Sequence, residues 1–492
     1  MLTKKIWFDE NSQPPKNMIW YKGVGKFYEY KNGEWVVAYD LNNTLAQQEQ
    51  DELLTVLKER YPDFEVNDKN TLTNVIEKIL DDINYINNKI NNIENYLGIT
   101  LEPEIDEKYY QYFTIEATED ETTIYFRQSA HAYNDSLDAL KVEVSTDDGE
   151  TWEEVTAAPA SGYDVPGAIL AELDARDKVL IRGKNEAYGY CPMGTVFDNC
   201  NFYSYKPCYI YGNIMSLIGG DDFARLRKVK EYAFAYFFSD WDEELNWSWV
   251  LSKEGEELLL PATMLAGYCY SSMFTGCVGL TTAPKLPATT LAEKCYGGMF
   301  IACMSLTSAP ELPATTLVDN CYSGMFWGCT GLTVAPELSA TTLANSCYEN
   351  MFAGCTNLTS VPELPATTLM DACYKEMFSG CSNLTTAPEL PATTLARSCY
   401  CYMFGNCTSL TSAPELPATT LVDYCYEGMF NMCTSLNYIR AMFTTTPSDT
   451  YTTDWVGDVA ASGTFVKNHA ATWDVTGNDG IPSGWTVETA DA

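Results

Sequence analysis

The sequence predicts a multi-domain fold that ends in an α/β solenoid, and three observations support this prediction. The chain has 492 residues, which is too long for one compact core. A 26-residue period links seven leucines, from Leu265 to Leu421, and such a period is typical of a solenoid in which each unit packs only against its neighbours. Upstream of the repeats lie a β-rich segment and an unbroken heptad pattern. We therefore expect an N-terminal β anchor, a parallel trimeric coiled coil, a β-sandwich-like module and then the solenoid.

Residues 1–40 are expected to form the small β anchor. The pair Asn32-Gly33 lies between an aromatic run and a β-branched run, which is a strong hairpin signal. Short hairpins are not stable alone, so this segment should dock onto another protein. The expected docking residues are Trp20, Tyr21, Phe27, Tyr28, Tyr30 and Trp35. Residues 41–65 are polar and predict a helical linker.

Residues 66–98 carry the heptad pattern that predicts the coiled coil. Its apolar positions alternate in steps of four and three residues, and the pattern ends at Gly98. Isoleucine at both the a and d positions favours three or more strands, so we predict a homotrimer. A helix packed on its own chain is the alternative. The predicted trimerisation residues are Leu72, Ile76, Ile79, Ile83, Ile86, Ile90, Ile93 and Leu97.

Residues 99–210 predict a β-sandwich-like module. Strands are indicated by the alternation in 113–117 and 142–144. Ser145–Trp152 reads S-T-D-D-G-E-T-W and resembles the Asp box of sialidases and other β proteins. That resemblance implies a hairpin turn in which Asp147 accepts backbone N–H groups and Trp152 packs beneath. A sialidase-like propeller would carry several copies, so the single copy favours a structural role.

Residues 261–440 predict the solenoid, with caps at 211–260 and 441–492. In each repeat, positions equivalent to Leu317, Cys321 and Met325 are four residues apart and predict a short helix, followed by a strand. Gly328 is placed for a left-handed helix C-cap. At the position equivalent to Gly328, two repeats carry Ala302 and Met432, and we expect the backbone to be distorted there.

Fourteen of the 18 cysteines form one C-x7-C pair in each of seven repeats. The N-terminal residues lack the apolar run of an export signal, so we expect reduced thiols in the core, with disulfides as the alternative. A zinc site is not expected, because C-x2-C spacing is absent and the chain has two histidines. No metal or cofactor is predicted. The net charge of −37 argues against nucleic-acid binding, and no segment suggests membrane insertion.

The unit C-Y-x-x-M-F-x-G-C-x-x-L-T-x-A-P-E-L-P-A-T-T-L, as at Cys321–Leu343, resembles the bacterial-surface-antigen type of leucine-rich repeat. Such repeats occur in Bacteroides-like bacteria, Mycoplasma and their phages, and the resemblance covers about residues 113–487. It implies a leucine-rich-repeat-like solenoid that serves adhesion, host recognition or virion decoration, and it implies no catalytic residues. The aromatic N-terminus is similar to fibre anchors of Bacteroides phages, including crAss-like phages.

We therefore predict a non-enzymatic fibre of a phage virion, on head or tail, assembled in the host cytoplasm. Its N-terminus should bind capsid or tail proteins, and its solenoid a host-surface protein or glycan. A bacterial cell-surface adhesin is the main alternative. A glycan-processing enzyme would need two facing carboxylates, whereas the recurrent glutamates form one row. Positions that vary between repeats are the candidate recognition residues: Trp327, Tyr402, Asp319 and Arg397.

Overall fold

The computed structural model describes residues 105–129, 140–160, 167–185, 202–239 and 249–491, and the backbone of four short strands near the N-terminus. The chain divides into two units, Met1–Asp106 and Glu107–Ala492. Each unit is described by itself.

The four strands of the first unit form one sheet in the order β1-β2-β3-β4. β3 and β4 are antiparallel, and Lys31 pairs with Glu34, so the hairpin predicted around Asn32-Gly33 is confirmed. The predicted docking residues lie on β2, β3 and β4, with Trp20 opposite Tyr28 and Tyr30 opposite Trp35. The bounds are β1 Ile6–Trp7, β2 Ile19–Tyr21, β3 Lys26–Lys31 and β4 Glu34–Asp40.

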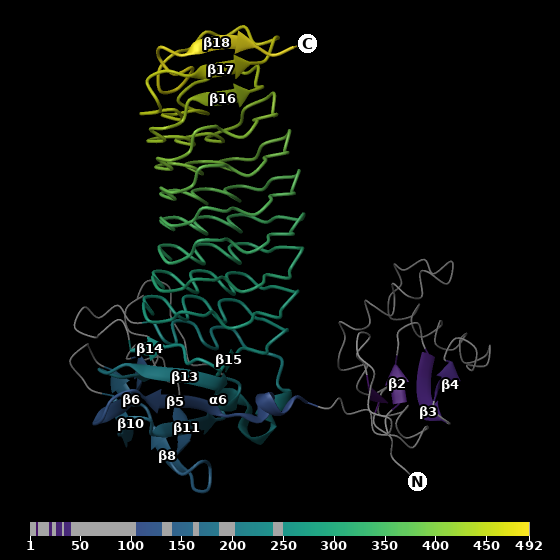
Figure 1. Cartoon of the computed structure of the whole chain (residues 1–492), viewed down its shortest axis with the longest axis vertical. Helices are drawn as coiled ribbons and strands as arrows, with labels where there is room; N and C mark the ends of the chain where they lie inside the picture. The colour runs from purple at the N-terminus through teal and green to yellow at the C-terminus, as the bar shows by residue number, and fades with distance from the viewer. Residues whose placement is uncertain are drawn as a thin grey trace. The chain divides into compact units, whose positions relative to one another are not determined.

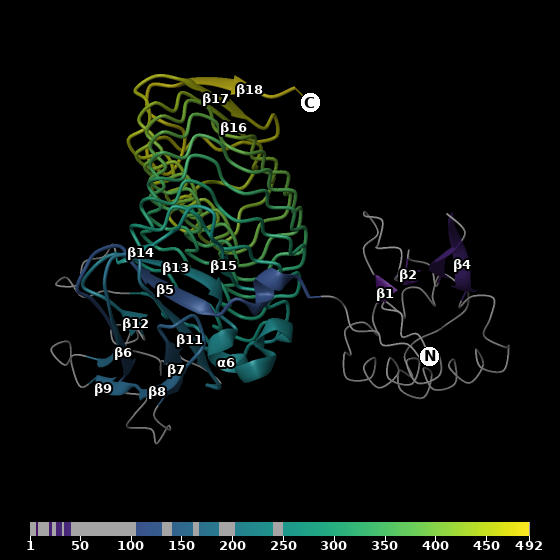
Figure 2. The same ribbon diagram turned by 60° about the horizontal axis from the view of Figure 1, so that its bottom comes forward.

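The second unit begins with two sheets that pack against each other (Figure 2). One sheet contains β5, β7, β8, β11 and β13, and the other contains β6, β9, β10 and β12. Phe113 of β5 stacks on Phe202 of β12 at a ring centroid distance of 6.1 Å, so both sheets share one core. After the 3-10 helix η1 (Glu107–Tyr110), the strands are β5 Phe113–Ala117, β6 Thr122–Ser129, β7 Lys141–Ser145, β8 Glu153–Thr156, β9 Ala158–Ala160, β10 Ala168–Leu173, β11 Lys178–Gly183, β12 Phe202–Tyr203 and β13 Cys208–Asn213.

The Asp-box motif forms the turn of the antiparallel β7–β8 hairpin. The Asp147 carboxylate accepts the Thr151 backbone N–H at 2.9 Å and the Ser145 hydroxyl at 2.7 Å. These hydrogen bonds, with that of the Thr151 hydroxyl first among them, lower the pKa of Asp147 to about 2. The Trp152 indole donates to the Gly149 carbonyl at 3.1 Å and lies against Tyr112. The predicted structural role of the motif is confirmed.

Strand β13 joins this module to the solenoid (Figure 1). It pairs antiparallel with β5 and parallel with β14 (Val250–Leu251) and β15 (Leu258–Leu259), which lie at the start of the solenoid. Helix α6 (Ser216–Gly219) and the 3-10 helix η2 (Gly220–Arg225) follow β13 in the chain. Lys253 and the buried Glu116 form an ion pair at 2.6 Å, which fastens the solenoid to β5.

The solenoid is a stack of 26-residue rungs, each beginning at a leucine of the series that includes Leu317. In the first part of a rung, the backbone forms overlapping β-turns. From Cys321 to Cys329, alternate N–H groups donate to the carbonyl three residues back at 3.0–3.3 Å. From Asn320 to Gly328, the intervening N–H groups donate to the next rung at 2.7–3.1 Å. Every backbone N–H of this segment is therefore satisfied without a helix.

Left-handed residues recur every four positions in these turns. Asn320, Gly324 and Gly328 have φ of 57°, 62° and 72°, as at the third position of a type II turn. Side chains consequently point inward in pairs and outward in pairs. The inward pairs are Cys321 with Tyr322 and Met325 with Phe326, and all four are buried.

Inward side chains of successive rungs stack into columns. The tyrosine rings from Tyr270 to Tyr426 lie 5.8–6.0 Å apart, with interplanar angles of 3–9°. The phenylalanine rings from Phe274 to Phe430 lie 5.5–5.8 Å apart. These columns form one continuous core along the solenoid axis.

Both ends of the columns are covered by aromatic residues. Phe234 stacks on Tyr270, and Phe238 stacks on Phe274. At the other end Trp455 packs on both columns, 6.2 Å from the ring of Phe430. There the parallel strands β16 (Tyr438–Ala441), β17 (Thr464–Lys467) and β18 (Thr486–Thr489) close the stack (Figure 1).

The predicted fold class is wrong. The described residues are almost entirely β-strands and turns, and their one α-helix is the four-residue α6. The predicted helix in each repeat is a run of turns, and the predicted strand is reduced to isolated parallel bridges, such as Val334–Ser360, in some of the repeats. A parallel trimeric coiled coil is not supported, and its predicted positions, from Leu72 to Leu97, lie outside the described residues. No helix among the described residues is long and apolar enough to cross a membrane.

The expected distortion at Ala302 and Met432 is also absent. Both residues adopt the left-handed conformation of the column, with φ of 56° and 63°. Their N–H groups donate to the next rung at 2.7 Å, as those of the glycines in this column do. The inter-rung hydrogen bonds therefore impose the conformation even where a side chain makes it unfavourable.

Candidate recognition faces of the solenoid

The outward side chains of the rungs lie on two faces. The turn face consists of the outward residues of 318–330 and of their equivalents in the other rungs. The extended face consists of the outward residues of 333–342 and of their equivalents. Both faces repeat with the rungs, so each presents columns of side chains to solvent.

The turn face varies from rung to rung, although the core beneath it does not. Two outward columns vary most. One contains Gly297, Ser323, Glu349, Lys375, Cys401 and Glu427, and the other contains Ile301, Trp327, Ala353, Ser379, Gly405 and Asn431; Cys401 and Ala353 are buried, and Trp327 is the exposed member. The inward columns between them keep Tyr, Met and Phe in every one of these rungs.

Trp327 is the most exposed aromatic side chain of the turn face, at 52%. It lies beside the glycine column, because a Cβ built on Gly354 would be 3.8 Å from Trp327 Cδ1. Gly328, Gly354 and Gly380 stack so closely that such a Cβ on Gly380 would be 3.5 Å from Gly354. The Trp327 indole and the backbone of these three glycines form a flat surface that could accept a planar or ring-shaped ligand.

Tyr402 is half-buried and less available than Trp327. Its ring covers Gly428, where a Cβ would lie 2.2 Å from the ring. Burial, with a contribution from Glu427, raises the pKa of Tyr402, so the phenol is neutral. Its role in the structure is to cover the next rung.

Asp319 and Arg397 are exposed members of one column, and both are engaged between rungs. Asp319 accepts the Asn345 N–H at 3.0 Å, and the Arg397 N–H donates to Asp371 at 3.2 Å. The Arg397 guanidinium also lies 5.7 Å from the centre of the Tyr424 ring. The four predicted recognition residues share the turn face but occupy two rungs that are three repeats apart, so they do not form one compact site.

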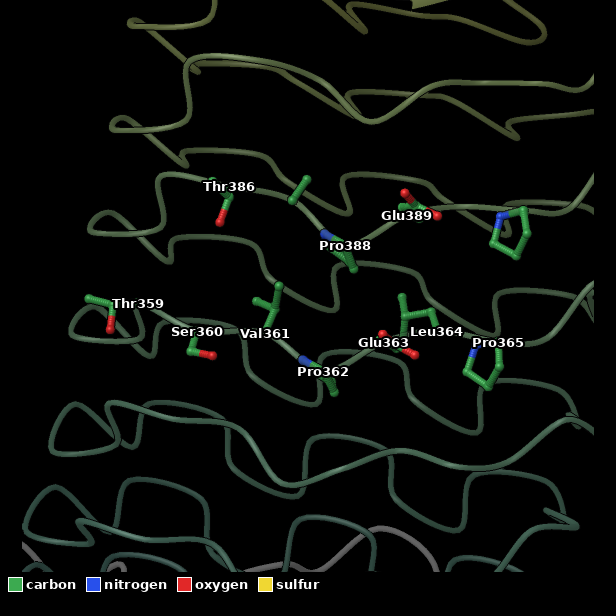
Figure 3. Close-up of a pocket in the computed structure, with 12 residues that line it drawn as sticks. Thr359, Ser360, Val361, Pro362, Glu363, Leu364, Pro365, Thr386, Pro388 and Glu389 are labelled. Carbon is green, nitrogen blue, oxygen red and sulfur yellow. The ribbon is translucent and has the colours of Figure 1, made fainter.

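The extended face carries a hollow that the sequence-based prediction missed. It has a volume of about 390 Å³ and lies between two consecutive rungs (Figure 3). The signal for it was the recurrence of A-P-E-L-P with few changes between repeats, which the prediction treated as structural. The lining includes Thr359, Ser360, Pro362, Glu363, Thr386 and Glu389.

The glutamates of the extended face form the predicted row. Lys285 occupies the first position of this column and pairs with Glu257 at 3.0 Å. The last glutamate, Glu415, pairs with Arg440 at 3.2 Å. The row of Glu311, Glu337, Glu363, Glu389 and Glu415 is therefore bordered by a cation at each end.

The repeat cysteines are buried thiols that fill the core. The second cysteine of each pair donates to a carbonyl of the preceding rung, as Cys329 does to Phe300 at 3.0 Å. Burial raises the pKa of Cys355 to about 12, so its thiol is not a nucleophilic thiolate at neutral pH. Within the described residues, no group of three or more His, Cys, Asp or Glu side chains could hold a metal ion.

Comparison with protein families identifies the repeats. The BspA type leucine rich repeat region matches in six copies, over residues 267–385 and 335–452, which is less than half of the chain. The chain therefore contains BspA-type leucine-rich repeats, and these indicate a surface-binding or adhesin-like role. Comparisons with curated proteins and with solved structures give no match.

Proposed function

We propose that this protein is a fibre of a phage virion, on head or tail, whose solenoid binds a host-surface protein or glycan through the turn face. The main observation behind the proposal is that residue types in the outward columns of the turn face change from rung to rung, whereas those of the core beneath do not. Core packing and inter-rung hydrogen bonds leave these outward positions free to differ, as a recognition surface requires. The exposed Trp327 is the candidate centre of this surface, because tryptophan dominates many binding interfaces.

The role we propose is binding without catalysis. The recurrent glutamates lie in one row on one face, which favours a surface of repeated contacts over a catalytic pair. Binding through several rungs, or through several fibres on one virion, would add weak contacts through avidity.

Attachment to the virion is proposed for the N-terminal sheet. Its four strands are short, and the β3–β4 hairpin is rich in aromatic residues. We propose that this sheet packs on another protein, for which a capsid or tail protein is our candidate. A bacterial surface adhesin would use the same solenoid, and mass spectrometry of purified virions and of host cells would distinguish the two.

Adsorption to host cells tests the proposed recognition surface. We expect Trp327→Ala to weaken adsorption about tenfold or more, because a central interface tryptophan contributes 2 kcal/mol or more. Tyr205→Ala is the matched control, since this aromatic side chain is also exposed, at 53%, but lies outside the solenoid. Unchanged adsorption by the Trp327 variant, with circular dichroism showing an intact fold, would contradict the proposal.

A further inference from the structure

We propose that the extended face is a second binding surface, which takes a linear polysaccharide without acidic groups along the solenoid axis. This inference rests on the proposed binding function, but it assigns a different face and a ligand class. The hollow between the rungs of Leu343 and Leu369 is the subsite from which this surface is inferred.

The extended face presents the same exposed groups in almost every rung. Its first threonine, its glutamate and the final pair of threonines recur with the repeat, and all are exposed. The turn face of the same rungs has diverged, so repetition of the whole unit does not by itself account for this uniformity. The uniform columns include Thr307, Thr333, Thr359, Thr385 and Thr411, and the glutamates from Glu311 to Glu415.

Core packing explains only part of this uniformity. Pro362 and Leu364 are buried and shape the backbone, and the Thr359 hydroxyl donates to the preceding rung at 3.3 Å. The Glu363 carboxylate is exposed and stands in a column of like charges at the spacing of the rungs. Stacked carboxylates repel one another, so this column does not stabilise the fold. A ligand that donates hydrogen bonds to this column would explain its recurrence.

The hollow has the composition of a carbohydrate subsite. Its volume of about 390 Å³ lies within the range of small-ligand pockets. Val361 and the exposed Pro365 supply apolar surface for the C–H groups of a sugar ring. Ser360 and Thr386 supply hydroxyl groups, and Glu363 and Glu389 supply carboxylates that accept hydrogen bonds from sugar hydroxyls. Figure 3 shows these side chains on two successive rungs.

The regular spacing of the rungs identifies the ligand as a polymer. The core rings of successive rungs lie 5.5–6.0 Å apart, so outward groups recur regularly and a ligand with repeating hydroxyl groups can make the same contact at several rungs. Several weak contacts then add up through avidity. The row of carboxylates repels acidic polymers, which restricts the ligand to neutral or amino-bearing chains.

Affinity gel electrophoresis of the full chain tests this inference, with a soluble mannan, a soluble β-glucan and a soluble chitosan as probes. We expect at least one of them to retard the protein, and a sulfated polysaccharide to have no effect. The double variant Glu363→Gln/Glu389→Gln should weaken retardation about tenfold or more, because two charge-assisted hydrogen bonds are weakened. Glu153→Gln/Glu154→Gln removes the same charge from two exposed positions of β8, outside the solenoid, and should leave the retardation unchanged.

The two proposals fail in different ways. No retardation by any of the three probes, or equal retardation of both double variants, overturns the inference about the extended face. It leaves the turn face untouched if Trp327→Ala still reduces adsorption to cells. Conversely, retardation that depends on Glu363 and Glu389, together with unchanged adsorption of the Trp327 variant, supports the extended face and contradicts the turn face.

Discussion

Gly324→Ala distinguishes a run of turns from a helix by the sign of its effect. In an exposed helix interior, alanine is about 1 kcal/mol more favourable than glycine. In the structure Gly324 has a φ of 62°, a left-handed conformation that alanine adopts only with strain. The same substitution therefore stabilises one fold and destabilises the other.

The magnitude follows from two opposing effects. A left-handed backbone costs an L-residue about 1–2 kcal/mol. Replacing glycine also reduces the conformational freedom of the unfolded chain, which stabilises the folded protein by about 0.4–1 kcal/mol. No atom lies within 4 Å of a Cβ built on Gly324, so steric overlap adds nothing. We expect a net destabilisation of roughly 1 kcal/mol.

The free energy of unfolding in urea, followed by tryptophan fluorescence and circular dichroism, measures this difference. Ala302→Gly is the reverse change at a left-handed position of the Gly328 column, since Ala302 has a φ of 56°, and it should stabilise the protein. Gly324→Asn should cost less than Gly324→Ala, because asparagine tolerates the left-handed region. An increase in stability for Gly324→Ala would refute the turn geometry and support the predicted helix.

Three further predictions concern the core and the Asp box. Phe352→Ala should destabilise the protein by about 3–5 kcal/mol in urea unfolding, because the ring is fully buried and stacks on both neighbours; a loss below about 1 kcal/mol would contradict the continuous column. Cys355 and the other repeat thiols, buried as they are, should resist a thiol reagent at pH 8 in the native protein and react in denaturant; rapid native reaction of the repeat thiols, located by peptide mapping, would contradict their burial. The pKa of Asp147 is lowered to about 2 in the folded protein, so its ionised carboxylate stabilises the turn. This stabilisation should be complete above the ordinary pKa of aspartate and should disappear as the pH falls from about 4 to about 2. Trp152 fluorescence reports this loss, and Asp147→Asn should remove the pH dependence.

The sequence was sufficient to predict the period of the solenoid, its cysteine core and the Asp box. Each depends on local chemistry or on repetition. The Asp box depends on hydrogen bonds within eight residues, from Ser145 to Trp152, and the Asn32-Gly33 hairpin depends on its turn residues. The period was visible because the leucines and cysteines must stack in register.

The helix in each repeat could not be excluded from the sequence. A pair of buried residues every four positions, such as Cys321-Tyr322 and Met325-Phe326, fits one face of a helix of 3.6 residues per turn over so short a segment. The two folds differ in hydrogen bonds to the next rung, which sequence periodicity does not reveal. The recurring glycine at 328 was informative, but a left-handed C-cap and a left-handed turn position require the same residue.

Ala302 and Met432 show why this solenoid can vary its surface without losing its fold. Both sit at a position that favours glycine, yet each keeps the backbone of the column because its N–H donates to the next rung at 2.7 Å. Backbone hydrogen bonds and buried rings determine the rung, whereas outward side chains contribute little to it. Substitution of an outward residue such as Trp327 should therefore change binding far more than stability. The turn face can consequently differ between rungs, and the recurrence of exposed glutamates on the extended face is not explained by core packing.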